Sequence, residues 1–126
     1  MTICEDLWVD PGLIPDSPYS CDPIEELLPH RPDLLVNLSA SPYTQGKLAL
    51  RRQLATAAAL RLHCPVLYVN QVGGNDELVF DGRSFVVDRS GSCPLTLPVA
   101  ASCTAWVDLQ DGQVCGRSLP VSAPPQ

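Results

Sequence analysis

The most constraining feature of the sequence is a strand, helix and strand pattern over residues 33–70. Residues 33–38 form a run of strand length dominated by Leu and Val, and they lead into a segment rich in Ser and Pro. Residues 66–70 form a second such run directly after Pro65. Apolar runs of this length are typical of buried strands, and a helix between two of them implies parallel pairing with a right-handed crossover. The sequence therefore predicts an α/β fold.

The predicted helix begins at Gly46 and Lys47 and ends before Pro65, which cannot continue a helix. His63, beside this stop, is interpreted as a C-terminal cap rather than as a general base. Apolar residues recur along the helix at helical spacing, namely Leu50, Leu54, Ala57, Ala58 and Leu62. We expect the polar residues on the opposite side of the helix, namely Arg51, Arg52, Gln53 and Thr56.

The segments before this unit are less regular. Residues 1–8 resemble the end of a strand that is entered late. Residues 9–32 contain several Pro and Asp turn formers, and we expect a connector with one helical turn at residues 24–28.

After the unit, residues 78–87 predict a hairpin whose two strands join at Asp81-Gly82, a dipeptide typical of tight hairpin turns. Residues 106–109 predict one more strand. We divide the chain into one domain over residues 1–109 and a Pro- and Ser-rich tail or interdomain linker over residues 110–126.

The charge pattern argues against nucleic acid and membrane partners. The net charge is −6, and the eight Lys and Arg residues are scattered, so that no basic stripe is present to bind phosphates. No apolar run approaches the roughly twenty residues of a membrane span, and no signal peptide pattern opens the sequence. We expect a cytoplasmic protein with no nucleic acid or membrane partner.

Six cysteines, an even number, raise the alternative of a disulfide framework. Their spacing is wide and the predicted strands and helix can build a core unaided, which favours free thiols. No C-x-x-C pair occurs, and neither His30 nor His63 has a second ligand at helical spacing, so we expect no metal site.

Polar residues gather where the predicted strands end, at Cys4, at residues 37–41 and at residues 70–75. The carboxyl ends of parallel strands meet at one edge of a sheet, where α/β proteins place their sites. Asn37 and Asn70 are interpreted there as hydrogen-bonding residues that fix loops. Taken alone, Cys4 is better interpreted as a buried structural thiol than as a nucleophile, and Trp8 either lines a pocket or packs in the core.

Four segments recur in an order that resembles the carbon–nitrogen hydrolase (nitrilase) superfamily. They are ICEDLW at residues 3–8, NLSASPYTQGK at residues 37–47, the Arg-bearing helix, and YVNQVGGNDELVFDGRS at residues 68–84. Within the superfamily, the sequence is most similar to the glutamine amidotransferase domain of glutamine-dependent NAD synthetases.

The resemblance implies a four-layer α-β-β-α sandwich, of which this chain supplies an incomplete half made of the strand-helix-strand unit and a hairpin. It also implies a Glu-Lys-Cys triad whose cysteine matches Cys4. The Glu and Lys precede the cysteine in the family, so we expect this chain to be the C-terminal half of the domain and to be inactive when isolated.

The implied reaction is the hydrolysis of glutamine to glutamate and ammonia, for NAD biosynthesis. Cys4 is the expected nucleophile, the backbone N–H of Glu5 an expected oxyanion donor, and Ser41 and Lys47 are expected to bind the amino-acid end of glutamine. Spacing alone favours a loop serine for Ser41 and a surface lysine for Lys47, and only the match to the motif brings the binding role level with these interpretations.

The resemblance also sets the expected partners. Glutamine is the substrate, and no cofactor binds this chain. The synthetase domain would use ATP and Mg, but its Ser-Gly-Gly-x-Asp-Ser loop does not occur in this sequence. The full-length protein is expected to be a homo-oligomer. Two alternatives stay open, namely a fragment of another amidase of the superfamily and a non-catalytic remnant.

Overall fold

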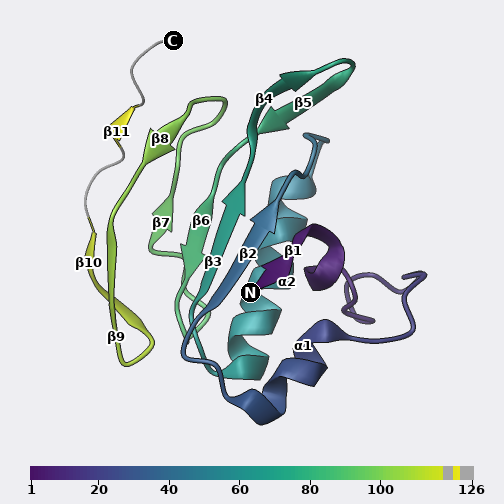
Figure 1. The fold of residues 1–126 in the computed structure, drawn as a ribbon, viewed down its shortest axis with the longest axis vertical. Helices are drawn as coiled ribbons and strands as arrows, with labels where there is room; N and C mark the ends of the chain where they lie inside the picture. Colours follow the sequence, from purple (N-terminus) through teal and green to yellow (C-terminus); the bar gives the residue numbers. More distant parts are fainter. Residues whose placement is uncertain (118–120, 123–126) are drawn as a thin grey trace.

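The computed structural model describes residues 1–117 and 121–122, and a five-stranded sheet forms its centre (Figure 1). The strand order is β1-β2-β3-β6-β7. These strands are β1 (Thr2–Ile3), β2 (Leu35–Ser39), β3 (Val66–Asn70), β6 (Phe85–Val87) and β7 (Leu95–Thr96). β1, β2 and β3 are parallel, whereas β6 and β7 pair antiparallel. The predicted parallel strand-helix-strand unit is therefore confirmed.

Helix α2 (Lys47–Leu62) connects β2 to β3 and packs on one face of the sheet. Gly46 precedes it with φ +79°, a left-handed conformation that glycine adopts without strain. His63 ends it as the C-cap, and its backbone N–H donates to the carbonyl of Ala59. The helix and its cap agree with the sequence prediction.

Three short helical segments surround the first strand and the start of β2. They are the 3-10 helix η1 (Cys4–Leu7), α1 (Pro23–Leu27) and the 3-10 helix η2 (Leu28–His30). The predicted helical turn near Ile24 is α1, whose N-cap Asp22 accepts from the backbone N–H of Ile24 at 3.0 Å. The core lies between these helices, α2 and the sheet, and it contains Leu7, Ile24, Leu35, Ala55, Ala58, Ala59, Leu62, Cys64, Val66, Tyr68, Phe85 and Val87.

The side chains of the sheet that point away from α2 include an exposed apolar row. Ile3 pairs in register with Leu38, and Leu38 pairs with Val69. These three residues are 58%, 42% and 45% exposed. A sheet with a helical layer on one face and an exposed apolar row on the other corresponds to one half of a sandwich.

The predicted hairpin turn at Asp81-Gly82 is wrong. The hairpin joins β4 (Val72–Asn75) to β5 (Leu78–Asp81), and it projects beyond the end of the sheet (Figure 1). Its turn lies at Asp76, which has φ +53°. Asp81 instead closes the ladder opposite Val72, and Gly82, with φ +65°, redirects the chain toward β6. The Gly73-Gly74 pair lies in β4.

The C-terminal part adds β8 (Cys103–Thr104), β9 (Val107–Gln110), β10 (Gln113–Arg117) and β11 (Val121–Ser122). The predicted strand at residues 106–109 is β9. The boundary predicted between residues 109 and 110 falls within the β9–β10 hairpin, and the extent of the tail stays a prediction. The rest of that tail, residues 118–120 and 123–126, lies outside the described residues.

Each of the six cysteines has a free thiol, and Cys64 is buried. Its burial raises the pKa of the Cys64 thiol, which disfavours the reactive thiolate. None of the described helices has the length and apolar character that crossing a membrane requires.

Candidate active site

Cys4 lies at the turn where β1 ends and η1 begins. It has φ +47°, a conformation that a side-chain-bearing residue rarely adopts. Asp6 holds the turn, because its carboxylate accepts from the backbone N–H of Ile3 at 2.8 Å. Glu5 follows in the first turn of η1, where a backbone N–H has no acceptor within the helix. A strained turn that presents a nucleophile at the end of a strand is a recurring catalytic geometry.

A buried hydrogen bond aligns the strand that carries Cys4. Asn37 in β2 donates from Nδ2 to Thr2 Oγ1 in β1 at 2.9 Å. Ser39 donates in turn to Asn37 Oδ1 at 2.6 Å. Asn37 therefore ties two parallel strands together, and not a loop as its position near the strand end suggested.

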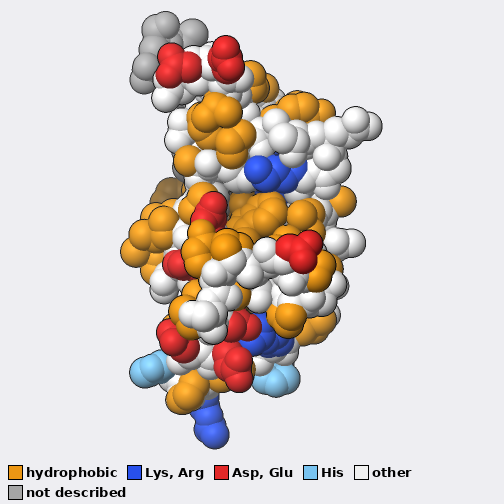
Figure 2. All heavy atoms as spheres, turned by 90° about the vertical axis from the view of Figure 1, so that its right-hand side faces the viewer, with side chains coloured by type: hydrophobic (Ala, Val, Ile, Leu, Met, Phe, Trp, Pro, Cys, Tyr) orange, Lys and Arg blue, Asp and Glu red, His pale blue; other side chains and the backbone are white. Residues whose placement is uncertain are grey.

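A cavity of about 300 Å³ brings all four predicted site residues together, namely Cys4, Glu5, Ser41 and Lys47. Trp8, Ile14, Pro18, Tyr19, Ala40 and Pro42 complete its lining. The residues come from η1, from the connector before α1, from the loop after β2 and from the start of α2. The side of the molecule that carries the N-terminal connector has a hydrophobic hollow bordered by charged side chains (Figure 2). We call the 300 Å³ cavity the Cys4 pocket.

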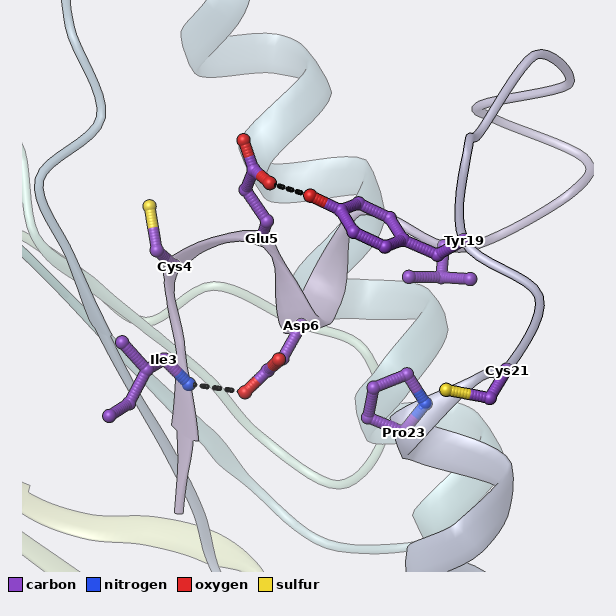
Figure 3. A pocket seen from close by; sticks show the side chains of 8 residues that line it. Ile3, Cys4, Glu5, Asp6, Tyr19, Cys21 and Pro23 are labelled. Carbon is purple, nitrogen blue, oxygen red and sulfur yellow. Dashed lines mark hydrogen bonds between the residues drawn. The ribbon is translucent and has the colours of Figure 1, made fainter.

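Tyr19, like Cys4 and Glu5, lines both the Cys4 pocket and a neighbouring cavity of about 400 Å³. Its phenol donates a hydrogen bond to the carboxylate of Glu5 (Figure 3). That hydrogen bond, together with the negative charge of Glu5, raises the pKa of Tyr19. Figure 3 also shows the Cys4 sulfur pointing away from Asp6 and from Cys21.

Lys47, the first residue of α2, has its Nζ 5.5 Å from the centroid of the Trp8 ring. Burial, followed by the like charge of Arg51, lowers the pKa of Lys47, while Cys4, Asp81 and Glu5 act in the opposite direction. Trp8 both lines the pocket and packs against the core, so both interpretations of this residue are confirmed.

Ser41 is buried at the edge of the pocket, and its backbone is fixed by Asn70 at the end of β3. Asn70 Oδ1 accepts from the Ser41 N–H at 2.9 Å. Asn70 Nδ2 donates to the Ser41 carbonyl at 3.3 Å and to the Gly82 carbonyl at 3.0 Å. The loop-fixing role predicted for Asn70 is confirmed.

Arg51 is buried, with 1% of its surface exposed, and its predicted place on the polar side of the helix is wrong. Nε donates to Ser41 Oγ at 3.2 Å, and a terminal nitrogen donates to the Ser41 carbonyl at 2.8 Å. Another terminal nitrogen pairs with Asp81 Oδ1 at 3.0 Å. The periodicity held a signal for this burial, since Arg51 extends the buried stripe of Leu54, Ala55, Ala58 and Leu62 by one turn.

The fold and this pocket define the class, and the comparison with known proteins agrees: the chain belongs to the carbon-nitrogen hydrolase family, whose model matches residues 29–114. It is 43% identical over 121 residues to the glutamine-dependent NAD(+) synthetase of Synechocystis sp., a match that covers 94% of this chain and 22% of the relative. It is 45% identical over 91 residues to the glutamine-dependent NAD(+) synthetase of Thermotoga maritima, covering 72% of this chain and 14% of the relative.

Solved structures show the same relationship. The glutamine-dependent NAD+ synthetase of Acinetobacter baumannii in complex with ADP matches with a TM-score of 0.64 and 38% identity, covering 78% of this chain and 16% of that one. An amidase of Nesterenkonia sp. AN1, solved with the acetamide moiety of fluoroacetamide added covalently at its active-site cysteine, matches with a TM-score of 0.58 and 22% identity, covering 77% of this chain and 32% of that one. The chain spans about a fifth of the length of the curated relatives, or less. The expected family and its fold are confirmed.

Proposed function

We propose that this chain carries the cysteine-bearing part of a glutamine-hydrolysing site, which supplies ammonia to NAD synthesis. One observation carries the proposal: a single pocket collects Cys4, Glu5, Ser41 and Lys47, which the motif match had selected from two separate segments. The relatives support the choice of glutamine, since those with 43% and 45% identity are glutamine-dependent NAD(+) synthetases.

The reaction begins when the Cys4 thiolate attacks the side-chain amide carbon of glutamine. The carbonyl oxygen becomes an oxyanion, and the backbone N–H of Glu5 donates to it. The amide nitrogen takes up a proton and leaves as ammonia, so that a glutamyl thioester remains on Cys4. Water then attacks the thioester, which releases glutamate and regenerates the thiol. Lys47 faces the α-carboxylate of the substrate, and Ser41 hydrogen bonds to its amino-acid end.

The attack requires a thiolate, and an ordinary cysteine thiol, with a pKa of about 8.5, needs help to ionise because only a few per cent of it is ionised at neutral pH. Glu5 and Asp6 do not provide this help. Each is bound elsewhere, to Tyr19 and to the N–H of Ile3, and a nearby negative charge disfavours a thiolate. We take the base Glu and the Lys of the triad that the family resemblance implies to come from outside these 126 residues. On this proposal the isolated chain binds glutamine but does not hydrolyse it.

We also propose a route for the ammonia and a setting for the full-length protein. Ammonia passes to a synthetase domain that uses ATP and Mg, in a cytoplasmic homo-oligomer. No cofactor is assigned to this chain.

Affinity labelling tests the proposal. We expect a chloroketone analogue of L-glutamine to alkylate Cys4 with saturation, and L-glutamine to protect the thiol while D-glutamine does not. Peptide mapping by mass spectrometry identifies the labelled cysteine, and a Cys4→Ala variant is the control. The exposed residues Cys21 and Cys93 report the unassisted rate of alkylation.

Two results decide against the proposal. Equal labelling of Cys4 and Cys21 without protection by L-glutamine contradicts glutamine binding, and protection by short aliphatic amides instead favours another amidase of the superfamily. A separate assay measures ammonia release from glutamine. Release by the purified chain that is lost in Cys4→Ala contradicts the expected inactivity.

A further inference from the structure

We infer that Arg51 is a positioning residue that fixes Ser41 beside the Cys4 pocket and leaves the Ser41 hydroxyl proton to donate to a ligand oxygen. The inference deepens the proposed function, and its statement about the ligand rests on that function. Arg51 itself does not line the Cys4 pocket and acts only through Ser41.

The guanidinium of Arg51 uses all three of its nitrogens. Nε donates to Ser41 Oγ at 3.2 Å, one terminal nitrogen contacts Asp81 Oδ1 and Oδ2 at 3.0 and 3.2 Å, and the other donates to the carbonyls of Ser41 and Pro42 at 2.8 and 3.1 Å. A buried charge needs such pairing, and the Asp81 side chain is itself only 5% exposed. The geometry is that of a planar fork, which a lysine ammonium does not reproduce.

The direction of the hydrogen bond between Arg51 and Ser41 is not ambiguous. A guanidinium stays protonated and has no acceptor atom, so Ser41 Oγ accepts from Nε. The Ser41 N–H is taken by Asn70, and the Ser41 carbonyl is taken by Arg51 and Asn70. The hydroxyl proton is the one donor of Ser41 for which no acceptor is found among the described residues.

Ser41 lines the Cys4 pocket, and on this inference its hydroxyl proton is directed to a ligand there. The matching ligand atom is an acceptor, such as a carboxylate or carbonyl oxygen. The second lone pair of Ser41 Oγ can still accept a hydrogen bond, but the positive charge of Lys47 in the same pocket disfavours an ammonium group there. We therefore assign Ser41 to an oxygen of the glutamine molecule, beside the positive charge of Lys47.

We call the hydrogen bonds from Arg51 to Ser41 Oγ and to the Ser41 carbonyl the clamp. Amide hydrogen exchange of the full chain tests the clamp without any ligand. Arg51→Lys keeps the charge opposite Asp81 but loses the fork, and we expect exchange in residues 39–43 to accelerate about tenfold. Arg52→Lys is the matched control, because Arg52 donates to Thr96 Oγ1 at 2.8 Å, away from the pocket. Unchanged exchange in a folded Arg51→Lys variant overturns the clamp.

Labelling of Cys4 by the L-glutamine chloroketone tests the donor. We expect Ser41→Ala and Arg51→Lys each to raise the half-saturating concentration about tenfold, with the maximal rate unchanged. The double variant should be no weaker than either single variant, since Arg51 acts through Ser41. The rate at which iodoacetamide alkylates Cys4 should be the same in these variants as in the natural chain.

The outcomes are distinguishable. If the half-saturating concentration of the chloroketone for Ser41→Ala equals that for the natural chain, the donor assignment is overturned, even if Arg51→Lys fails to fold. If Arg52→Lys raises the half-saturating concentration as much as Arg51→Lys does, the donor assignment is overturned as well. Labelling of the natural chain that does not saturate overturns the proposed function and with it the ligand assignment, while the exchange result still decides the clamp.

Discussion

Tyr19 and Glu5 show how single side chains shape the rim of the Cys4 pocket. The phenol donates to the Glu5 carboxylate and thereby ties the N-terminal connector to η1. Arg51 has the corresponding role beneath the pocket, where it fixes Ser41. At both places a charged side chain near the pocket is held by a structural partner.

The raised pKa of Tyr19 gives a pH prediction. The hydrogen bond to Glu5 raises the pKa of Tyr19 in the folded chain, so this contact stabilises fully below the ordinary tyrosine pKa and is lost as pH rises through the raised value. In Glu5→Gln, which keeps an acceptor but loses the charge, we expect the Tyr19 pKa to fall toward its ordinary value. Titration followed by NMR of ring-labelled tyrosine measures it. An unshifted pKa of Tyr19 in the natural chain contradicts the contact.

At the scale of elements, helical periodicity predicted the extent of α2 but not which of its side chains are buried. The start, end and length of the helix follow from Gly46, Pro65 and the apolar spacing. Its rotation does not follow, because the buried stripe runs through Arg51, Ala55 and Ala59, while Leu50 is only half-buried. An ion pair to β5 turned the polar residue inward.

The start of α2 gives a stability prediction. Gly46 has φ +79° and nothing lies within 4 Å of an added Cβ, so Gly46→Ala introduces backbone strain without a clash. We expect the free energy of unfolding to fall by about 1 kcal/mol, measured by urea denaturation. Gly46→Asn should lose less, because Asn tolerates the left-handed region. Gly74→Ala is the control, since its φ is ordinary and its nearest neighbour, the Leu78 carbonyl oxygen, is 3.8 Å away. Equal losses for Ala and Asn at position 46 contradict the explanation.

At the scale of the whole molecule, the sheet has a helical layer on one face and the row of Ile3, Leu38 and Val69 on the other. Contiguous exposed apolar surface favours association. The chain spans 22% and 14% of the lengths of the two NAD(+) synthetases compared above. The two observations agree, since a half sandwich exposes the face that a second layer would cover.

This face gives a prediction about association. We expect Leu38→Thr combined with Val69→Thr to reduce self-association of the isolated chain, while the thermal midpoint changes little because both side chains are exposed and Thr suits a strand. Sedimentation velocity over a range of concentrations measures the effect. Leu60→Gln, at an exposed leucine of α2, is the control and should leave association unchanged. Sedimentation of the double variant identical to that of the natural chain contradicts the prediction.

The strand-helix-strand unit was predictable because strand and helix periods are local properties, readable from a few adjacent turns. The four candidate site residues were found through motif resemblance, and spacing alone did not separate Ser41 and Lys47 from ordinary loop and surface residues. The β4–β5 hairpin was misplaced because Asp81-Gly82 has the local preferences of a turn, whereas Asp81 is held by Arg51. Arg51, whose contact with Asp81 prevails over the turn preference, lies thirty residues away in the sequence.

The sequence by itself determined the parallel unit, the long helix and the membership in the carbon-nitrogen hydrolase family, since each depends on residues close together along the chain. Only the tertiary structure decided which polar residues are buried and which surround one pocket. Arg51 is inside because Asp81 and the carbonyls of Ser41 and Pro42 satisfy its charge and its N–H groups. Such pairing joins distant segments, and local periodicity contains no information about it.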